Sequence, residues 1–159
     1  MFDINKFSMG ATAAIITSMG LVAGLNQRTG AKISIITGLL VIAIADNVSD
    51  SLGIHIYKES EGASKQDIRS TTYGNFFVRL ILAFTFVAIV MLFSSRTAFI
   101  VSSVWGLVLL AILSHLIAKR RKTRPLREIA WHLVVALAVI AGSKLLGHLI
   151  FETMSHSKL

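Results

Sequence analysis

The stretch LILAFTFVAIVMLF, residues 80–93, decides the fold class, because it contains no charged residue and Thr85 is its one polar side chain. A second stretch, VWGLVLLAILSHLI, residues 104–117, is continuous in the same way except at Ser114 and His115. Strands of a membrane β-barrel alternate apolar and polar residues over about ten positions, whereas membrane-spanning helices carry continuous apolar runs. Both stretches therefore predict helices that cross a membrane.

The rest of the chain agrees with this prediction. It has 159 residues, of which 54% are hydrophobic, and its mean hydropathy is +0.72, whereas a soluble domain is less apolar and more charged. A helix needs roughly 20 residues to cross about 30 Å of hydrocarbon. Five segments reach that length: residues 8–26, 33–57, 74–94, 97–118 and 129–151. We predict an all-α, multi-pass integral membrane protein with a single transmembrane domain over residues 1–159, in the inner or plasma membrane if the source is a prokaryote.

Basic residues predict the orientation, because cytoplasmic loops carry the excess of Lys and Arg. With the N-terminus inside, the cytoplasmic side receives Lys6, Lys58, Lys65, Arg69, Arg79, Lys119, Arg120, Arg121, Lys122, Arg124 and Arg127. The opposite side receives Arg28, Lys32, Arg96, Lys144 and Lys158. This ratio of about two to one favours N-in and C-out. The net charge of +8 is thus explained by topology and by contact with lipid head groups, and we expect no nucleic-acid partner.

The second span carries two acidic residues, Asp46 and Asp50. At about 100° per residue they lie about 40° apart on one helix face, with Asn47 and Ser49 close by. An aspartate in the middle of a membrane costs about 2.5–3.5 kcal/mol unless it faces a cavity, a partner or a cation. Protonation relieves part of that cost, so the pair predicts cation handling and proton transfer. The alternative is a packing role in which a basic residue such as Arg79 holds both carboxylates.

The first span, SMGATAAIITSMGLVAGL, is rich in small residues. Its Gly20-x-x-x-Gly24 spacing predicts close packing against another helix, either in the same chain or in a second copy. Thr17 and Met19 lie on this span, and the Met19 thioether is either a soft metal ligand or a core side chain.

Other residue types narrow the chemistry. The chain has no cysteine, so a metal site must use oxygen, imidazole or thioether ligands. The five histidines lack the spacing of four residues that would bring two imidazoles to one ion, and none is predicted as a ligand. Glu59 and Glu61 follow the second span, where they could attract cations at a cytoplasmic mouth or form a solvated helix end. No Ser-His-Asp order, zinc-protease motif or phosphate loop is present, so we expect no enzymatic activity.

Three segments carry a family resemblance: TSMGLVAGL (residues 17–25), SDSLG (residues 49–53) leading into YKESE (residues 57–61), and Pro125-Leu126-Arg127 before AGSKLLGHLI (residues 141–150). In this order, on five spans, they resemble the vacuolar iron transporter family. The resemblance implies a homodimer that exports Fe²⁺ or Mn²⁺ from the cytosol in exchange for protons. It also implies an ion path near the first two helices, between the subunits.

The chain departs from the family at four positions. The family's first-span aspartate falls on Ala13, its second-span glutamates on Ile42 and Ile54, and its second-span methionine on Asp50. The glutamate-rich metal-binding domain of iron-transporting members is replaced here by about 15 residues between the second and third spans. An oxygen-only site suits Mn²⁺, Mg²⁺ or Ca²⁺ at least as well as Fe²⁺.

The sequence thus predicts a proton-coupled transporter of a divalent metal ion, with Fe²⁺ or Mn²⁺ as its substrate and no tightly bound cofactor. Asp46 and Asp50 are its expected central ligands or proton acceptors. The expected remainder of the path is formed by Asn47, Ser49, Thr17 and Met19. The alternative is a membrane scaffold, accessory subunit or sensor that keeps the fold and does not transport.

Overall fold

A computed structural model describes residues 5–26 and 30–156 of the chain, with side chains from Phe7 onward. The described residues form α1 (Asn5–Leu25), α2 (Lys32–Val41), the π-helical segment η1 (Ile42–Asp46), α3 (Asn47–Ser60), α4 (Lys65–Leu92), α5 (Ser95–Arg121) and α6 (Pro125–His156). Because α2, η1 and α3 follow one another without a break, these elements make five spans, each long and apolar enough to cross a membrane. The predicted all-helical fold with five spans is confirmed. Of the basic residues used to predict the topology, Arg28 and Lys158 lie outside the described residues, as does the side chain of Lys6.

Local sequence explains where the helices begin and end. The Ser64 hydroxyl accepts a hydrogen bond from the Asp67 backbone N–H at 3.2 Å and so caps α4,. The helix therefore starts nine residues before the predicted apolar span at residue 74. Pro125 opens α6, a position where its missing N–H costs nothing,. Gly62 has a φ of +69° in the turn between α3 and α4, a backbone conformation that glycine adopts without strain.

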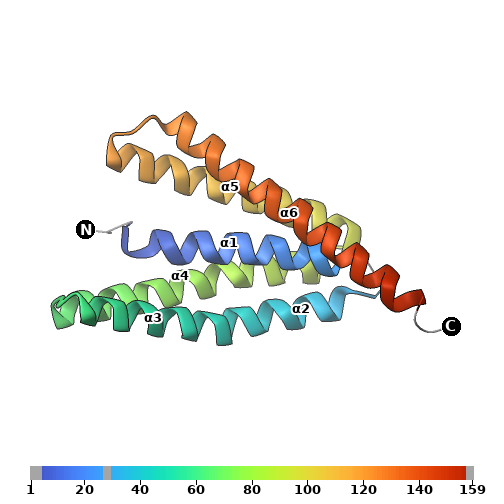
Figure 1. The fold of residues 1–159 in the computed structure, drawn as a ribbon, viewed down its shortest axis with the longest axis horizontal. Helices are drawn as coiled ribbons and strands as arrows, with labels where there is room; N and C mark the ends of the chain where they lie inside the picture. The colour runs from blue at the N-terminus through green and yellow to red at the C-terminus, as the bar shows by residue number, and fades with distance from the viewer. Residues whose placement is uncertain (1–4, 27–29, 157–159) are drawn as a thin grey trace.

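The first helix lies at the centre of the bundle (Figure 1). The continuous rod α2–η1–α3 and α4 lie on one side of α1, and α5 and α6 lie on the other. Half of the apolar window of α1 is buried, against 6% for α6, so α1 is the core helix and α6 is peripheral. The start of α1, the α3–α4 turn and the α5–α6 turn lie together at one end, called here the N-terminal end of the bundle.

The interior mixes apolar and polar side chains. Its largest fully buried apolar residues include Phe86, Ile15, Met19 and Leu39. Eight polar or charged residues are also buried among those that the structure describes: Ser18, Asn47, Ser51, Thr71, Asn75, Arg79, Ser102 and Ser114. Large apolar side chains meanwhile cover the outside of every helix, Trp131 and Leu146 of α6 among them. An apolar exterior around polar groups suits a lipid environment, in which polar atoms need partners inside the protein.

Small residues let α1 contact its neighbours closely. A Cβ on Gly20 would lie 3.1 Å from the Ser143 hydroxyl oxygen, and one on Gly24 would lie 3.3 Å from the Ser143 carbonyl oxygen. The predicted packing of the Gly20-x-x-x-Gly24 spacing against another helix is confirmed, and that helix is α6 of the same chain.

Candidate functional site

A buried arginine joins the two aspartates of the second span. Arg79, on α4, donates from Nη1 to Asp50 Oδ2 and from Nη2 to Asp46 Oδ2. We call these three residues the Asp–Arg–Asp triad. The Arg79 side chain is 3% exposed, whereas the Asp46 and Asp50 side chains are 45% and 43% exposed. The carboxylates therefore face the guanidinium on one side and the surroundings of the bundle on the other.

The triad lies halfway along its helices. At 1.5 Å per residue, Arg79 is about 21 Å from Lys65 and about 20 Å from Leu92, the two ends of α4,. With both carboxylates ionised, two negative charges oppose one positive charge. This leaves one negative charge unbalanced at the depth where an uncompensated charge is most costly in a membrane.

The π-helical segment η1 precedes α3 directly and ends at Asp46. The buried residues of this rod repeat every four positions: Ile35, Leu39, Ala43, Asn47 and Ser51. In a regular α-helix such a row rotates by about 40° at each step. The wider turn of η1 rotates the chain by a smaller angle per residue and so compensates for part of that rotation. One side of the rod therefore faces α4 along its length. Short π segments are frequent at functional sites.

Four buried polar residues adjoin the triad between α3 and α4. We call them the polar seam: Asn47 and Ser51 from α3, Thr71 and Asn75 from α4. Asn47 Nδ2 donates to the Phe76 carbonyl oxygen at 2.9 Å, which fixes how the two antiparallel helices align. Asn47 Oδ1, Ser51 Oγ, Thr71 Oγ1 and both amide atoms of Asn75 have no hydrogen-bond partner among the described residues. A buried polar group left unsatisfied costs about 1–3 kcal/mol, so five such atoms in one seam require an explanation.

A glycine brings α1 against this seam. A Cβ on Gly10 would overlap the Asn75 side chain and would lie 3.0 Å from Arg79 Cγ. The seam and the stem of Arg79 are thus enclosed by three helices, α1, α3 and α4.

The other predicted pathway residues do not join the triad. Ser49 is exposed. The Thr17 side chain is also exposed, and its hydroxyl donates to the Ala13 carbonyl oxygen of its own helix at 2.7 Å. Met19 is buried where α1 packs against Gly106 of α5. The described residues contain no group of three or more His, Cys, Asp or Glu positioned to hold a metal ion. The predicted metal shell stays a prediction.

The two predicted mouth residues lie at the N-terminal end of the bundle. Glu59 and Glu61 are exposed beside the α3–α4 turn. A hydrogen bond from the Tyr57 hydroxyl to Glu61 Oε1, 2.6 Å long, lowers the pKa of the Glu61 carboxyl group. Lys58 Nζ lies 3.5 Å from Glu61 and 4.0 Å from Asp67. The lowered pKa favours the anionic form of Glu61, and Lys58 offsets part of the negative charge at this turn.

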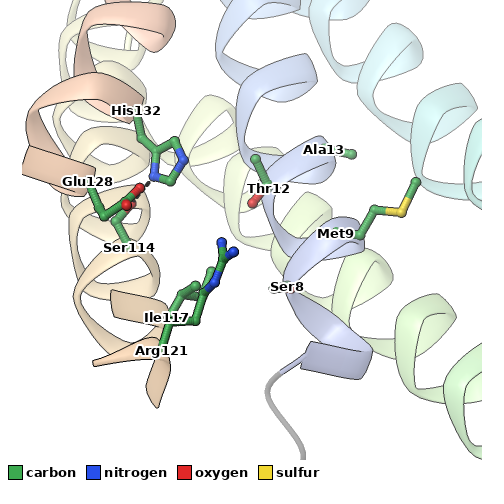
Figure 2. A pocket seen from close by; sticks show the side chains of 9 residues that line it. All are labelled: Ser8, Met9, Thr12, Ala13, Ser114, Ile117, Arg121, Glu128 and His132. Atoms are coloured by element: carbon green, nitrogen blue, oxygen red, sulfur yellow. Dashed lines mark hydrogen bonds between the residues drawn. The ribbon is translucent and has the colours of Figure 1, made fainter. Parts of the chain in front are cut away.

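A separate cavity of about 450 Å³ lies between α1, α5 and α6, also toward the N-terminal end (Figure 2). Ser114 Oγ donates to the Leu110 carbonyl oxygen at 2.6 Å and lies 2.8 Å from His132 Nδ1. Because the serine has a single proton, a Ser114 hydroxyl that donates to Leu110 can only accept from His132, in the tautomer that carries its proton on Nδ1. Arg121 and Glu128 also line this cavity. His132 was not predicted as a ligand. Its contact with Ser114 joins two different helices, α6 and α5, and no spacing in the sequence indicates such a contact.

No family model, no curated protein and no solved structure matches the chain. The resemblance to vacuolar iron transporters therefore stays a prediction from the sequence.

Proposed function

We propose that this chain is a membrane transporter that moves a divalent metal ion, Fe²⁺ or Mn²⁺, out of the cytosol in exchange for protons. In this proposal the Asp–Arg–Asp triad is the point where ion and proton exchange. One observation carries it: two carboxylates share a single buried guanidinium halfway along the spans. Intramembrane ionisable groups of this kind mark ion and proton pathways.

The unbalanced negative charge of the triad attracts either of two cations, a proton or a metal ion. A proton on Asp46 or Asp50 leaves a neutral triad, because the remaining carboxylate still pairs with Arg79. A metal ion approaching the exposed sides of the carboxylates displaces the guanidinium from at least one of them. Arg79 then acts as a tethered competitor of the ion, and it returns to the carboxylate when the ion leaves. Ion and proton therefore compete for the same oxygens, which is the requirement for exchange.

The exposed sides of Asp46 and Asp50 also bear on assembly. Carboxylates that are more than 40% exposed on a span would face lipid on their open sides in a single copy, which still carries a cost although Arg79 pairs with each of them. A homodimer in which a second copy covers this face of α3 relieves that cost. The proposed transporter is therefore a dimer, oriented N-in and C-out.

The same geometry gives the second candidate function its support. Arg79 already satisfies both aspartates, and the ion pairs tie α3 to α4. A scaffold, accessory subunit or sensor would need nothing more from the triad than this link.

Ion uptake into proteoliposomes separates the two candidates. Fe²⁺, Mn²⁺, Mg²⁺ and Ca²⁺ are supplied to the parent protein and to the double variant Asp46→Asn/Asp50→Asn, with a pH reporter inside the vesicles. We expect metal flux with opposing proton movement in the parent, and flux at the level of empty liposomes in the double variant. Glu152→Gln makes the same chemical change on α6, outside the triad, and should transport normally. Folded parent protein that moves none of the four ions would support the scaffold instead.

A further inference from the structure

The polar seam has a fixed direction along the bundle. The alignment of α3 and α4 set by the Asn47–Phe76 hydrogen bond places Ser51 level with Thr71, and Asn47 level with Asn75. Thr71 lies six residues, about 9 Å, from the start of α4 at the N-terminal end,. From there the buried row of α4 continues through Asn75 to Arg79, one turn of helix at each step. The seam thus leads from the N-terminal end of the bundle to the triad.

The same row becomes apolar beyond Arg79. The next buried residues of α4 are Ala83, Phe86, Val87 and Val90. Apart from Ile68 near its start, the buried row of α4 is therefore polar as far as Arg79 and apolar beyond it. If the row served packing alone, we would not expect its side chains to change from polar to apolar at Arg79.

The seam atoms do not satisfy one another. Ser51 Oγ, Thr71 Oγ1 and the Asn75 amide have no partner among the residues that the structure describes. A water molecule between such groups satisfies both, and buried waters occupy sites of this kind.

We propose that the polar seam is a half-channel for water and protons, which runs from the N-terminal end of the bundle to the triad and ends there. The proposal rests on the proposed function in taking the triad as the place of proton exchange. When a metal ion replaces a proton at the triad, the O–H bond on Asp46 or Asp50 breaks, and the proton passes as hydronium from water to water along the seam to the N-terminal end. The seam groups themselves are neutral hydroxyls and amides and do not change protonation.

The chemistry of the seam favours protons over metal ions. Its amide nitrogen on Asn75 presents donors, and the Arg79 guanidinium repels a divalent ion twice as strongly as it repels hydronium. A proton needs only a chain of hydrogen bonds to move between the carboxylates and the N-terminal end, whereas a metal ion would need space for its oxygen ligands along the whole seam. The triad therefore has two approaches: protons pass through the seam, and metal ions arrive at the exposed sides of Asp46 and Asp50.

Cysteine labelling tests the half-channel directly, because the chain has no cysteine of its own. Thr71→Cys and Ser51→Cys place a thiol in the seam, and Ala83→Cys places one in the same buried row beyond Arg79. The probe is the small, neutral, water-soluble reagent hydroxyethyl methanethiosulfonate, which reacts with the thiolate that forms where water reaches. We expect both seam variants to react at least about tenfold faster than Ala83→Cys. Equal rates at the three positions, in proteins with the parent melting temperature, would overturn the half-channel.

A second variant tests proton movement. Asn75→Leu keeps the branched shape of the side chain and fills the seam with an apolar group. We expect slower proton movement in proteoliposomes, with metal binding to the detergent-solubilised protein unchanged. Unchanged proton movement in the folded variant would contradict the proposal. Labelling does not depend on transport, so reactive seam cysteines in a protein that moves no ion would remove the proposed function and keep the half-channel. Ion flux in a protein whose seam cysteines are unreactive would keep the proposed function and remove the half-channel.

Discussion

At the scale of single residues, the members of the triad are not equivalent. Arg79 is its one cation, so Arg79→Gln leaves two carboxylates without a counter-charge, whereas Asp46→Asn leaves Asp50 paired with Arg79. Removing one partner of a buried ion pair typically costs about 3–5 kcal/mol. We expect a loss of stability near this range for Arg79→Gln and below about 1 kcal/mol for Asp46→Asn.

Unfolding by denaturant in detergent micelles, followed by circular dichroism, measures this difference. The double variant Asp46→Asn/Asp50→Asn is the matched comparison, because it leaves the guanidinium buried and alone. It should be destabilised as strongly as Arg79→Gln. If Asp46→Asn and Arg79→Gln lowered the stability equally, the charge imbalance of the triad would not be what determines its stability.

The residues of the triad and Asn47 of the seam were found in the sequence, but the other three seam residues were not. Helical spacing brings Asp46 and Asp50 to one face, and Arg79 was the basic partner expected under the packing alternative. Thr71 and Asn75 were missed because Thr71 precedes the apolar window at residue 74 and Asn75 lies at its edge. The signal that would have found them is the spacing of four that links Thr71, Asn75 and Arg79.

At the scale of elements, the position of α1 depends on Gly10. A methyl group there would overlap Asn75, which is itself fully buried and cannot move freely. We expect Gly10→Ala to lower the free energy of unfolding by about 1–3 kcal/mol, the usual cost of overpacking. Gly53→Ala is the control, since nothing lies within 4 Å of its added Cβ.

Helix propensity works in the opposite direction at the control position. Alanine is favoured over glycine inside a helix by about 1 kcal/mol, so Gly53→Ala should leave the melting temperature unchanged or raise it. Thermal unfolding of both variants, read by circular dichroism, gives the comparison. Equal melting temperatures for the two variants would mean that α1 does not need the close approach to α4.

The π-helical turn of η1 is an element that the sequence did not indicate. Periodicity at 100° per residue assumes a regular α-helix, and VIAIAD contains no proline or glycine that would signal an irregular turn. The five spans themselves were predictable, because apolar length alone identifies them. The start of α4 was not predictable from apolar length, because its first residues are polar. They become helical through the Ser64 cap.

At the scale of the whole molecule, the charges of the two ends differ. Within the described residues, the N-terminal end carries Lys58, Lys65, Arg69 and the cluster Lys119–Arg127. The opposite end carries Lys32, Arg96 and Lys144. Since Lys and Arg are retained on the cytoplasmic side, we expect the N-terminal end, and with it the opening of the polar seam, to face the cytosol.

A membrane-impermeant thiol reagent applied to intact cells tests this orientation. Ser94→Cys, in the α4–α5 turn, should be labelled from outside. Ala63→Cys, in the α3–α4 turn, should be labelled only after the membrane is broken. The opposite pattern would place the mouth of the seam outside the cell. In the proposed exchange protons enter the cytosol as metal ions leave it, so a seam that opens to the cytosol is the route by which protons leave Asp46 and Asp50. A seam that opens outside the cell would instead be the route by which they arrive. The orientation of the chain therefore determines whether the seam releases or supplies the protons that drive export.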